Sequence, residues 1–148
     1  MKPHYHVAFS TIISGVLYLI FKSSALSISC LISGIFIDLD HVIDYIREHG
    51  LTLNPIKFIR DFNSGNFDRI YLIFHAWECL LVLAFISWLY DWNPWITGVL
   101  IGFSQHILLD ALHNTRNFQS YSLLWRWKKD FIFSSVFEGC PCTSRKLD

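Results

Sequence analysis

Long apolar stretches separated by short polar breaks dominate the pattern of this chain. Four apolar segments stand out, at residues 7–21, 25–37, 70–90 and 95–112. A helix that crosses a membrane needs about 20 residues, with a range of about 17 to 25. The last two segments have this length as they stand, and the first two reach it if their helices extend into the flanking residues. The pattern predicts an all-α fold, a transmembrane bundle of four helices.

Local signals predict where these helices begin and end. The signals are, in chain order, Ser23 or Ser24 as the cap of the second helix, Gly50 as its end, Asp68 as the cap of the third, Asn93-Pro94 as the start of the fourth and Asn114 as its end. The connections near Lys22 and at residues 91–93 are short, so we expect antiparallel helix pairs there.

The composition agrees with a membrane protein. Hydrophobic residues make up 53% of the chain and charged residues 16%, and the mean hydropathy is +0.37. These values are more apolar and less charged than those of an ordinary soluble domain. The net charge is zero, so no basic surface argues for a nucleic-acid partner.

Lysine and arginine fall almost entirely on one side of the predicted membrane. With four crossings, eleven of the twelve share the side of the two termini and the central loop, and Lys22 alone lies on the other. The positive-inside rule places that richer side in the cytoplasm. We therefore expect a multi-pass protein of the cell membrane with both termini in the cytoplasm.

Seven residues able to bind a metal lie at the cytoplasmic ends of the apolar segments. They are His6, Asp38, Asp40, His41, His75, His106 and Asp110. Ionisable side chains are costly at membrane depth and usually mark function there. A mixed set of histidines and carboxylates suits a divalent ion, and we expect one or two ions, with zinc as the expected metal. The count of lysines and arginines did not use these residues. The charge distribution and the ligand positions therefore indicate the same, cytoplasmic face independently.

The spacing of the ligands suits helices that meet at one centre. Asp38 and His41 are three residues apart, and His106 and Asp110 are four apart, so each pair can share a helix face. Asp40 is displaced from Asp38 on the helix. It could bridge a second metal, bind from a distorted helix end, or hold a histidine by its free N–H. Whether His4, Glu78 and His113 are further ligands stays open.

A metal held by histidine and carboxylate lowers the pKa of water bound to it to about 7 and polarises a phosphoryl or carbonyl oxygen. Glu78, three residues after His75, or Asp40 could accept the proton from that water. These residues predict a membrane-bound hydrolase. Because the cluster lies at headgroup depth, we expect a phosphoester substrate such as a lipid headgroup. The phosphate-holding candidates are Lys57, Arg60 and Arg69.

Residues 1–114 thus form a predicted membrane-embedded, metal-binding helical domain. Residues 115–148 form a predicted cytoplasmic or interfacial tail, because aromatic and basic residues such as Trp125, Trp127 and Lys128 suit the membrane–water boundary. Cys140 and Cys142 have a spacing that is too short for an ordinary metal site, so we expect them to be inert or acylated.

The motifs resemble those of the YdjM-like family of membrane-bound metal-dependent hydrolases. That family has an early histidine, a central Asp-x-Asp-His, a mid-chain histidine and a late His-x3-Asp, here His6, Asp38-Leu39-Asp40-His41, His75 and His106-Ile107-Leu108-Leu109-Asp110. The resemblance covers residues 4 to 114 and implies a small multi-span protein with a metal-dependent hydrolytic site. The chain departs from the family at residues 68–70, where a His-Arg-Gly element is common, and Glu78 is a candidate substitute.

Three other interpretations remain. Asp38-Leu39-Asp40 after an apolar stretch also matches the first motif of haloacid dehalogenase phosphatases, but that fold needs alternating strands and helices. A membrane haem protein would use His75 and His106 as axial ligands and would leave the aspartates unexplained. A non-enzymatic membrane metal-binding protein, with a role in transport or regulation, is compatible with every motif.

Overall fold

The computed structural model describes residues 3–50, 68–114 and 117–137. Over these ranges the chain is helical, which confirms the predicted all-α class, and its only strand-like feature is an isolated antiparallel bridge between Arg69 and Ile132. The helices are α1 (Pro3–Phe21), α2 (Ser24–Phe36), α3 (Leu39–His49), α5 (Trp77–Leu89), α6 (Pro94–Asn114), the 3-10 helix η1 (Phe118–Tyr121), α7 (Leu123–Lys128) and α8 (Phe133–Val136).

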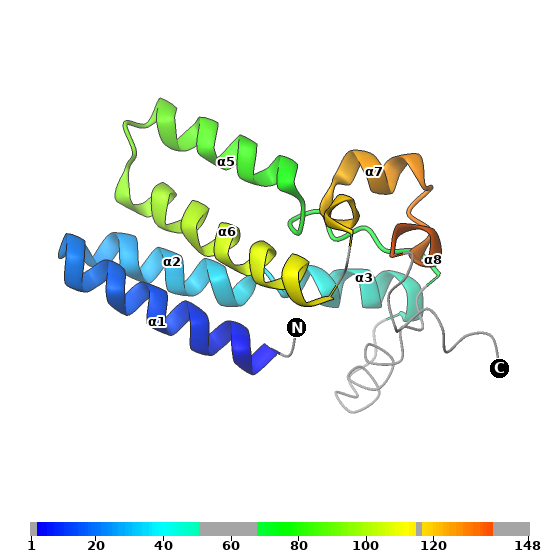
Figure 1. Cartoon of the computed structure of the whole chain (residues 1–148), viewed down its shortest axis with the longest axis horizontal. Coiled ribbons are helices and arrows are strands. Elements are labelled where there is room, and N and C mark those ends of the chain that lie inside the picture. Colours follow the sequence, from blue (N-terminus) through cyan, green and yellow to red (C-terminus); the bar gives the residue numbers. More distant parts are fainter. Residues whose placement is uncertain (1–2, 51–67, 115–116, 138–148) are drawn as a thin grey trace.

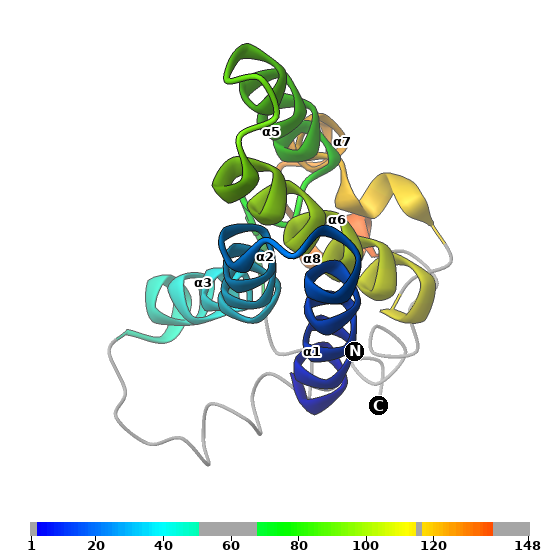
Figure 2. The same ribbon diagram turned by 90° about the vertical axis from the view of Figure 1, so that its left-hand side faces the viewer.

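Four helices run along the long axis of the molecule and leave it with two unlike ends. The most extensive contact joins α2 to α6, α1 packs on both, and α5 packs on α6 (Figures 1 and 2). The two short helix connections lie at one end. At the other end lie α3, η1, α7 and α8, and α1 begins near the middle of the long axis (Figure 1).

Small residues allow α2 and α6 to approach closely. A Cβ added at Gly98 or Gly102 would overlap atoms of α2, including its backbone carbonyl oxygens. Ser33 of α2 donates a hydrogen bond across this contact to the carbonyl of Val99, at 3.4 Å. Small residues that bring helix backbones together are typical of membrane proteins, where the hydrophobic effect does not drive helices together.

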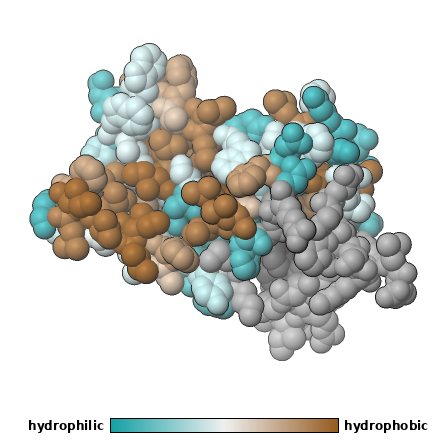
Figure 3. Space-filling view, viewed as in Figure 1, coloured by the Kyte–Doolittle hydropathy of each residue, from teal (hydrophilic) through white to brown (hydrophobic). Residues whose placement is uncertain are grey.

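Unlike a water-soluble protein, the four-helix part exposes many large apolar side chains and buries several polar ones. Large apolar residues such as Ile12, Leu19 and Leu81 are exposed, whereas Ser10 and Ser87 are buried. Figure 3 shows apolar residues over much of the four-helix part. By length and composition, three helical stretches could cross a membrane: His4–Phe21, Ser24–His49 and Pro94–His113. These features are those of a membrane protein, and the fourth predicted crossing stays a prediction because α5 has only 13 residues.

The second predicted helix is interrupted in the middle. Ser23 caps α2 by accepting a hydrogen bond from the Leu26 amide, as expected, but α2 ends at Phe36. The chain then makes a tighter turn, in which the amide of Asp40 bonds to the carbonyl of Ile37 at 3.1 Å. The next helix, α3, runs in a new direction (Figure 2) and ends at Gly50, whose φ of 74° favours glycine. The predicted helix end at Gly50 is therefore confirmed, and the prediction of one continuous second helix is wrong.

The third predicted helix starts later than expected. Asp68 does not cap it, because α5 begins at Trp77, and residues 70–76 form an irregular connection. Leu72 in this connection has a φ of 42°, which a leucine rarely adopts. The predicted fourth helix matches α6 at both ends. Asn93 accepts a hydrogen bond from the Trp95 amide at 3.0 Å, and Pro94 is the first helical residue.

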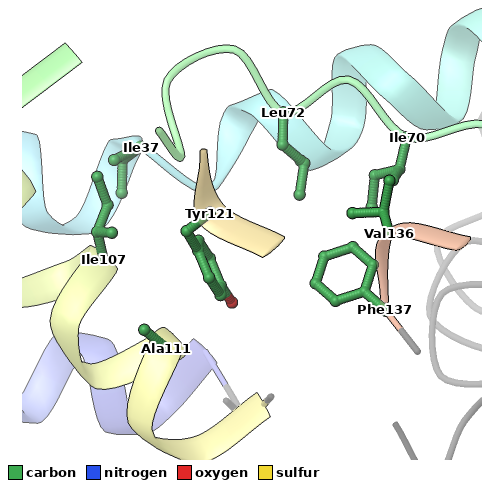
Figure 4. Close-up of a cluster of buried hydrophobic side chains, with 8 residues drawn as sticks. All are labelled: Ile37, Ile70, Leu72, Ile107, Ala111, Tyr121, Val136 and Phe137. Atoms are coloured by element: carbon green, nitrogen blue, oxygen red, sulfur yellow. The ribbon is translucent and has the colours of Figure 1, made fainter. Parts of the chain in front are cut away.

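A buried apolar cluster lies at the end of the molecule that carries α3 and α7. Its members come from α6, the α2–α3 break, residues 70–76 and the C-terminal elements, and they are Ile37, Ile70, Leu72, Ile107, Ala111, Tyr121, Val136 and Phe137 (Figure 4). The proposed division at residue 114 stays a prediction. Within residues 117–137, however, the C-terminal elements pack into the same cluster as α6.

Candidate metal centre

Four of the seven predicted ligands converge on one point. One ligand atom from each of Asp38, His75, His106 and Asp110 lies within 4.8 Å of the others, an arrangement that could hold a metal ion. The break after α2 supplies Asp38, the irregular residues before α5 supply His75, and α6 supplies the other two. His75, His106 and Asp110 are buried, and the side chain of Asp38 is 30% exposed.

The hydrogen bonds of the two histidines fix which nitrogen faces the centre. His106 Nδ1 lies 2.7 Å from the carbonyl oxygen of Gly34, which can only accept, so Nδ1 carries the proton. His75 Nδ1 lies 3.4 Å from Oδ2 of Asp40, so it donates to that carboxylate. When Nε2 is deprotonated, as metal binding requires, each ring presents its lone pair to the centre. Such an outer partner is the usual companion of a metal-binding histidine.

Two histidine nitrogens and two carboxylate oxygens meet at this point. The two Nε2 atoms are 3.3 Å apart. His106 Nε2 is 3.2 Å from Asp38 Oδ1 and 3.5 Å from Asp110 Oδ2. His75 Nε2 is 3.7 and 3.9 Å from the same oxygens. For metal–ligand bonds of about 2.0–2.1 Å, the edge of a tetrahedron is roughly 3.3–3.4 Å. A divalent cation at the middle of these four atoms would neutralise both carboxylates, so the donor set fits such an ion.

The other three predicted ligands surround this group. His6 is buried, stacks on the His106 ring at 3.8 Å between centroids, and donates from Nε2 to Oδ1 of Asp110 at 3.1 Å. Asp40 accepts the amide of Phe74 at 2.7 Å and faces His75 Nδ1. Among the three roles left open for Asp40, this geometry favours holding a histidine. His41 lies at the edge, with Nε2 3.8 Å from Asp38 Oδ1.

Glu78 is placed elsewhere. Its carboxylate accepts hydrogen bonds from the Ser122 hydroxyl at 2.6 Å and from the amides of Leu123 and Leu124 at 2.9 and 3.2 Å. It therefore caps the start of α7 and lies outside the group of four ligands. His4 and His113 are exposed and also lie outside it. Lys57, Arg60, Cys140 and Cys142 fall beyond the described residues, so the predictions for them stay predictions.

Three groups that the sequence analysis did not single out complete the site. The Gly34 carbonyl fixes the His106 ring. Asp44 accepts the amides of Tyr71 and Leu72 at 2.7 and 2.9 Å, just before His75. Arg126 of α7 donates to carbonyls of the same irregular residues. A signal existed for Asp44, because it lies one helical turn after Asp40, whereas nothing local distinguishes Arg126 from the other cations of the tail.

Within the described residues, the group of ligands is most exposed at Asp38, and we call this side the opening. The neighbouring His41 has a side chain that is 17% exposed. Large apolar side chains close to Asp38 in the chain are exposed, by 57% for Phe36 and 53% for both Leu39 and Ile43.

No family model, curated protein or solved structure matches this chain, so the resemblance to YdjM-like hydrolases stays a prediction and the metal centre is assigned from its own geometry.

Proposed function

We propose that this protein is a membrane-bound, divalent-metal-dependent hydrolase that acts on a phosphoester. The observation that carries the proposal is the convergence of the Nε2 atoms of His75 and His106 with carboxylate oxygens of Asp38 and Asp110. Zinc is the expected ion, because mixed histidine and carboxylate ligands at tetrahedral spacing suit it. Bound there, the ion would activate water and polarise a phosphoryl oxygen.

Three of the four ligands have the role of holding the metal, and the fourth has a different role. His75, His106 and Asp110 are each held by a further group, respectively Asp40, the Gly34 carbonyl and His6. Three fixed protein ligands are the usual number in a catalytic zinc site. Asp38 is the fourth, it is the most exposed, and it lies on a helix break. We therefore assign Asp38 as the proton acceptor that faces the opening, in place of Glu78, whose carboxylate caps α7.

The surroundings of the opening favour a lipid as the source of the phosphoester. The exposed apolar side chains of Phe36, Leu39 and Ile43 would lie against acyl chains if the ligands sit at headgroup depth. In the proposed topology, residues 70–76 and α5 together make the fourth crossing. Irregular backbone is tolerated at such depth only where it is buried in protein, as Ile70 and Leu72 are.

A second candidate function rests on the count of ligands. Four protein atoms within 4.8 Å of one another can complete a tetrahedron without any water, which is typical of structural zinc sites. In that case the protein keeps its metal without catalysis and serves a transport or regulatory role.

Purified protein in detergent, made without a histidine tag, distinguishes the two. We expect about one zinc ion per chain by elemental analysis, and hydrolysis in a panel of phospholipids and nucleotides. Asp38→Asn should keep the ion and lose turnover, whereas Asp110→Asn should lose the ion. Metal-loaded protein that hydrolyses nothing in the panel would support the second candidate, and protein that binds no divalent ion would exclude both.

The proposed topology has its own test. Eleven of twelve lysines and arginines favour one side if there are four crossings. Reporter fusions at Asp91 and after Asp148 should therefore report opposite sides of the membrane, with the second in the cytoplasm. The same side for both fusions would contradict four crossings.

A further inference from the structure

Among the four ligands, His75 comes from the irregular residues 70–76. It follows Leu72, whose φ of 42° places a non-glycine residue in the left-handed region, and its amide bonds to the Leu72 carbonyl at 3.1 Å. Such a backbone is strained and persists only where the surroundings fix it. The groups that fix this backbone therefore also fix the position of His75.

The amides of this stretch are held by two carboxylates of α3. Asp44 Oδ2 accepts from Tyr71 and Leu72, and Asp40 Oδ2 accepts from Phe74. Asp40 also faces the His75 ring. These four contacts hold one side of the backbone against α3.

The carbonyls of the same stretch are held by a single guanidinium. Arg126 Nη1 donates to the Tyr71 and Leu72 carbonyls at 2.7 and 2.5 Å, and Nη2 donates to the His75 carbonyl. The Arg126 side chain is 0% exposed, and its Nε donates to the Ser120 carbonyl at 2.8 Å. Burial lowers the pKa of Arg126 to about 10, so it stays charged at neutral pH and complements the two buried aspartates.

The helix that carries Arg126 is anchored on the same part of the molecule. Glu78 at the start of α5 caps α7, and the indole of Trp77 donates to the Phe118 carbonyl at 2.9 Å. The amide of Ile70 bonds to the Phe131 carbonyl, also at 2.9 Å. These contacts support one another: the start of α5 holds α7 in position, and Arg126 of α7 holds the residues that precede α5.

We propose that Arg126 is a positioning residue of the metal centre, which holds the backbone of residues 71–75 so that His75 Nε2 meets His106 Nε2. A residue of the predicted tail is thereby part of the site. A lysine would keep the charge at this position but could not serve four carbonyls with a planar fork. The inference rests on the metal centre of the proposed function and is independent of hydrolysis.

The test compares Arg126→Lys and Arg126→Gln with Lys128→Gln, which changes an exposed cation of the same helix. Zinc affinity is measured by competition with a chelator, and Co²⁺ is used as a spectroscopic probe of the ligand geometry. We expect both Arg126 variants to bind zinc about 10- to 100-fold more weakly, the usual effect of removing a partner that orients a ligand. Their cobalt absorption band should shift at saturation, and Lys128→Gln should match the unsubstituted chain.

Helix content and thermal unfolding in detergent separate positioning from folding. A purely structural role would lower the unfolding temperature and leave the cobalt band of the folded fraction unchanged, which would overturn the proposal. Arg126→Lys is the deciding variant if Arg126→Gln does not fold, and failure of both to fold would also contradict it. If the unsubstituted chain binds no metal, the centre and this inference fall together. If it binds metal without turnover, only hydrolysis is excluded.

Discussion

Two regions bring ligands to the same centre by opposite means. In α6, His106 and Asp110 lie one turn apart on a regular helix, and close packing of glycines against α2 fixes that helix. Residues 70–76 carry His75 on irregular backbone, and charged groups hold it from both sides. A ligand on a helix needs only apolar and small-residue packing, because the helix satisfies its own backbone. A ligand on irregular backbone needs buried charges to satisfy the backbone in place of a helix.

The packing of α6 is the feature whose loss should have the largest effect. A Cβ at Gly102 would overlap Ser33 Oγ and the Cys30 carbonyl, so Gly102→Leu must push α6 away from α2. We expect the free energy of unfolding to fall by more than about 3 kcal/mol, because the overlap is with backbone. Helix content against temperature in detergent measures it.

Gly15→Leu is the matched control on α1. A Cβ there meets nothing within 4 Å, so the same substitution should be tolerated, and replacing a helical glycine is itself favourable by roughly 0.5–1 kcal/mol. Similar unfolding temperatures for the two variants would show that α2 and α6 are not in close contact.

Loss of either histidine ligand should come next in size. His75→Ala and His106→Ala each remove one Nε2 from the pair that lies 3.3 Å apart. We expect both to weaken zinc binding by more than the roughly 10- to 100-fold caused by losing an orienting partner. Competition with a chelator measures this affinity. A variant that loses metal while the other keeps it would mean that the two regions do not share one centre.

The regular region was largely predictable from the sequence. Four-residue spacing placed His106 and Asp110 on one face, and Asn93-Pro94 and Asn114 marked the ends of α6 as observed. These features are local, because a helix repeats the same geometry along its length. The sequence also placed Asp38, His75 and His106 at one shared end of the apolar segments, and the structure brings these three residues together.

The irregular region was not predictable to the same degree. An apolar run such as 70–76 looks the same whether it continues a helix or is buried as irregular chain, so α5 was expected to start too early. Arg126 lies about 50 residues from the carbonyls that it binds, and its aromatic neighbours suggested the membrane surface. Glu78 was chosen for its spacing from His75, but that spacing assumed a helix that begins only at Trp77.

Weakening one support of the irregular region should have a moderate effect. Asp44→Asn removes the charge that attracts the amides of Tyr71 and Leu72, although one oxygen can still accept. Hydrogen bonds to a charged group contribute about 1.5–3 kcal/mol. We therefore expect the free energy of unfolding to fall by part of that amount and the zinc affinity to weaken about tenfold. Glu48→Gln changes another acid of α3 and should leave zinc binding unchanged. Equal zinc affinity in both variants would remove Asp44 from the support of His75.

Glu78→Gln should have the smallest effect. The structure uses this carboxylate to cap α7, where an amide oxygen can still accept from Ser122 or Leu123. Loss of a helix cap costs about 1 kcal/mol, so a partial loss should lower the unfolding temperature slightly and leave both zinc content and any phosphoester hydrolysis intact. Zinc analysis and turnover on the same preparation check this. Retained zinc with abolished turnover would restore Glu78 as the proton acceptor that its spacing predicts. It would also mean that α7 moves away from Glu78 in the working enzyme, so the irregular region would then be a mobile part of the site and not its fixed support.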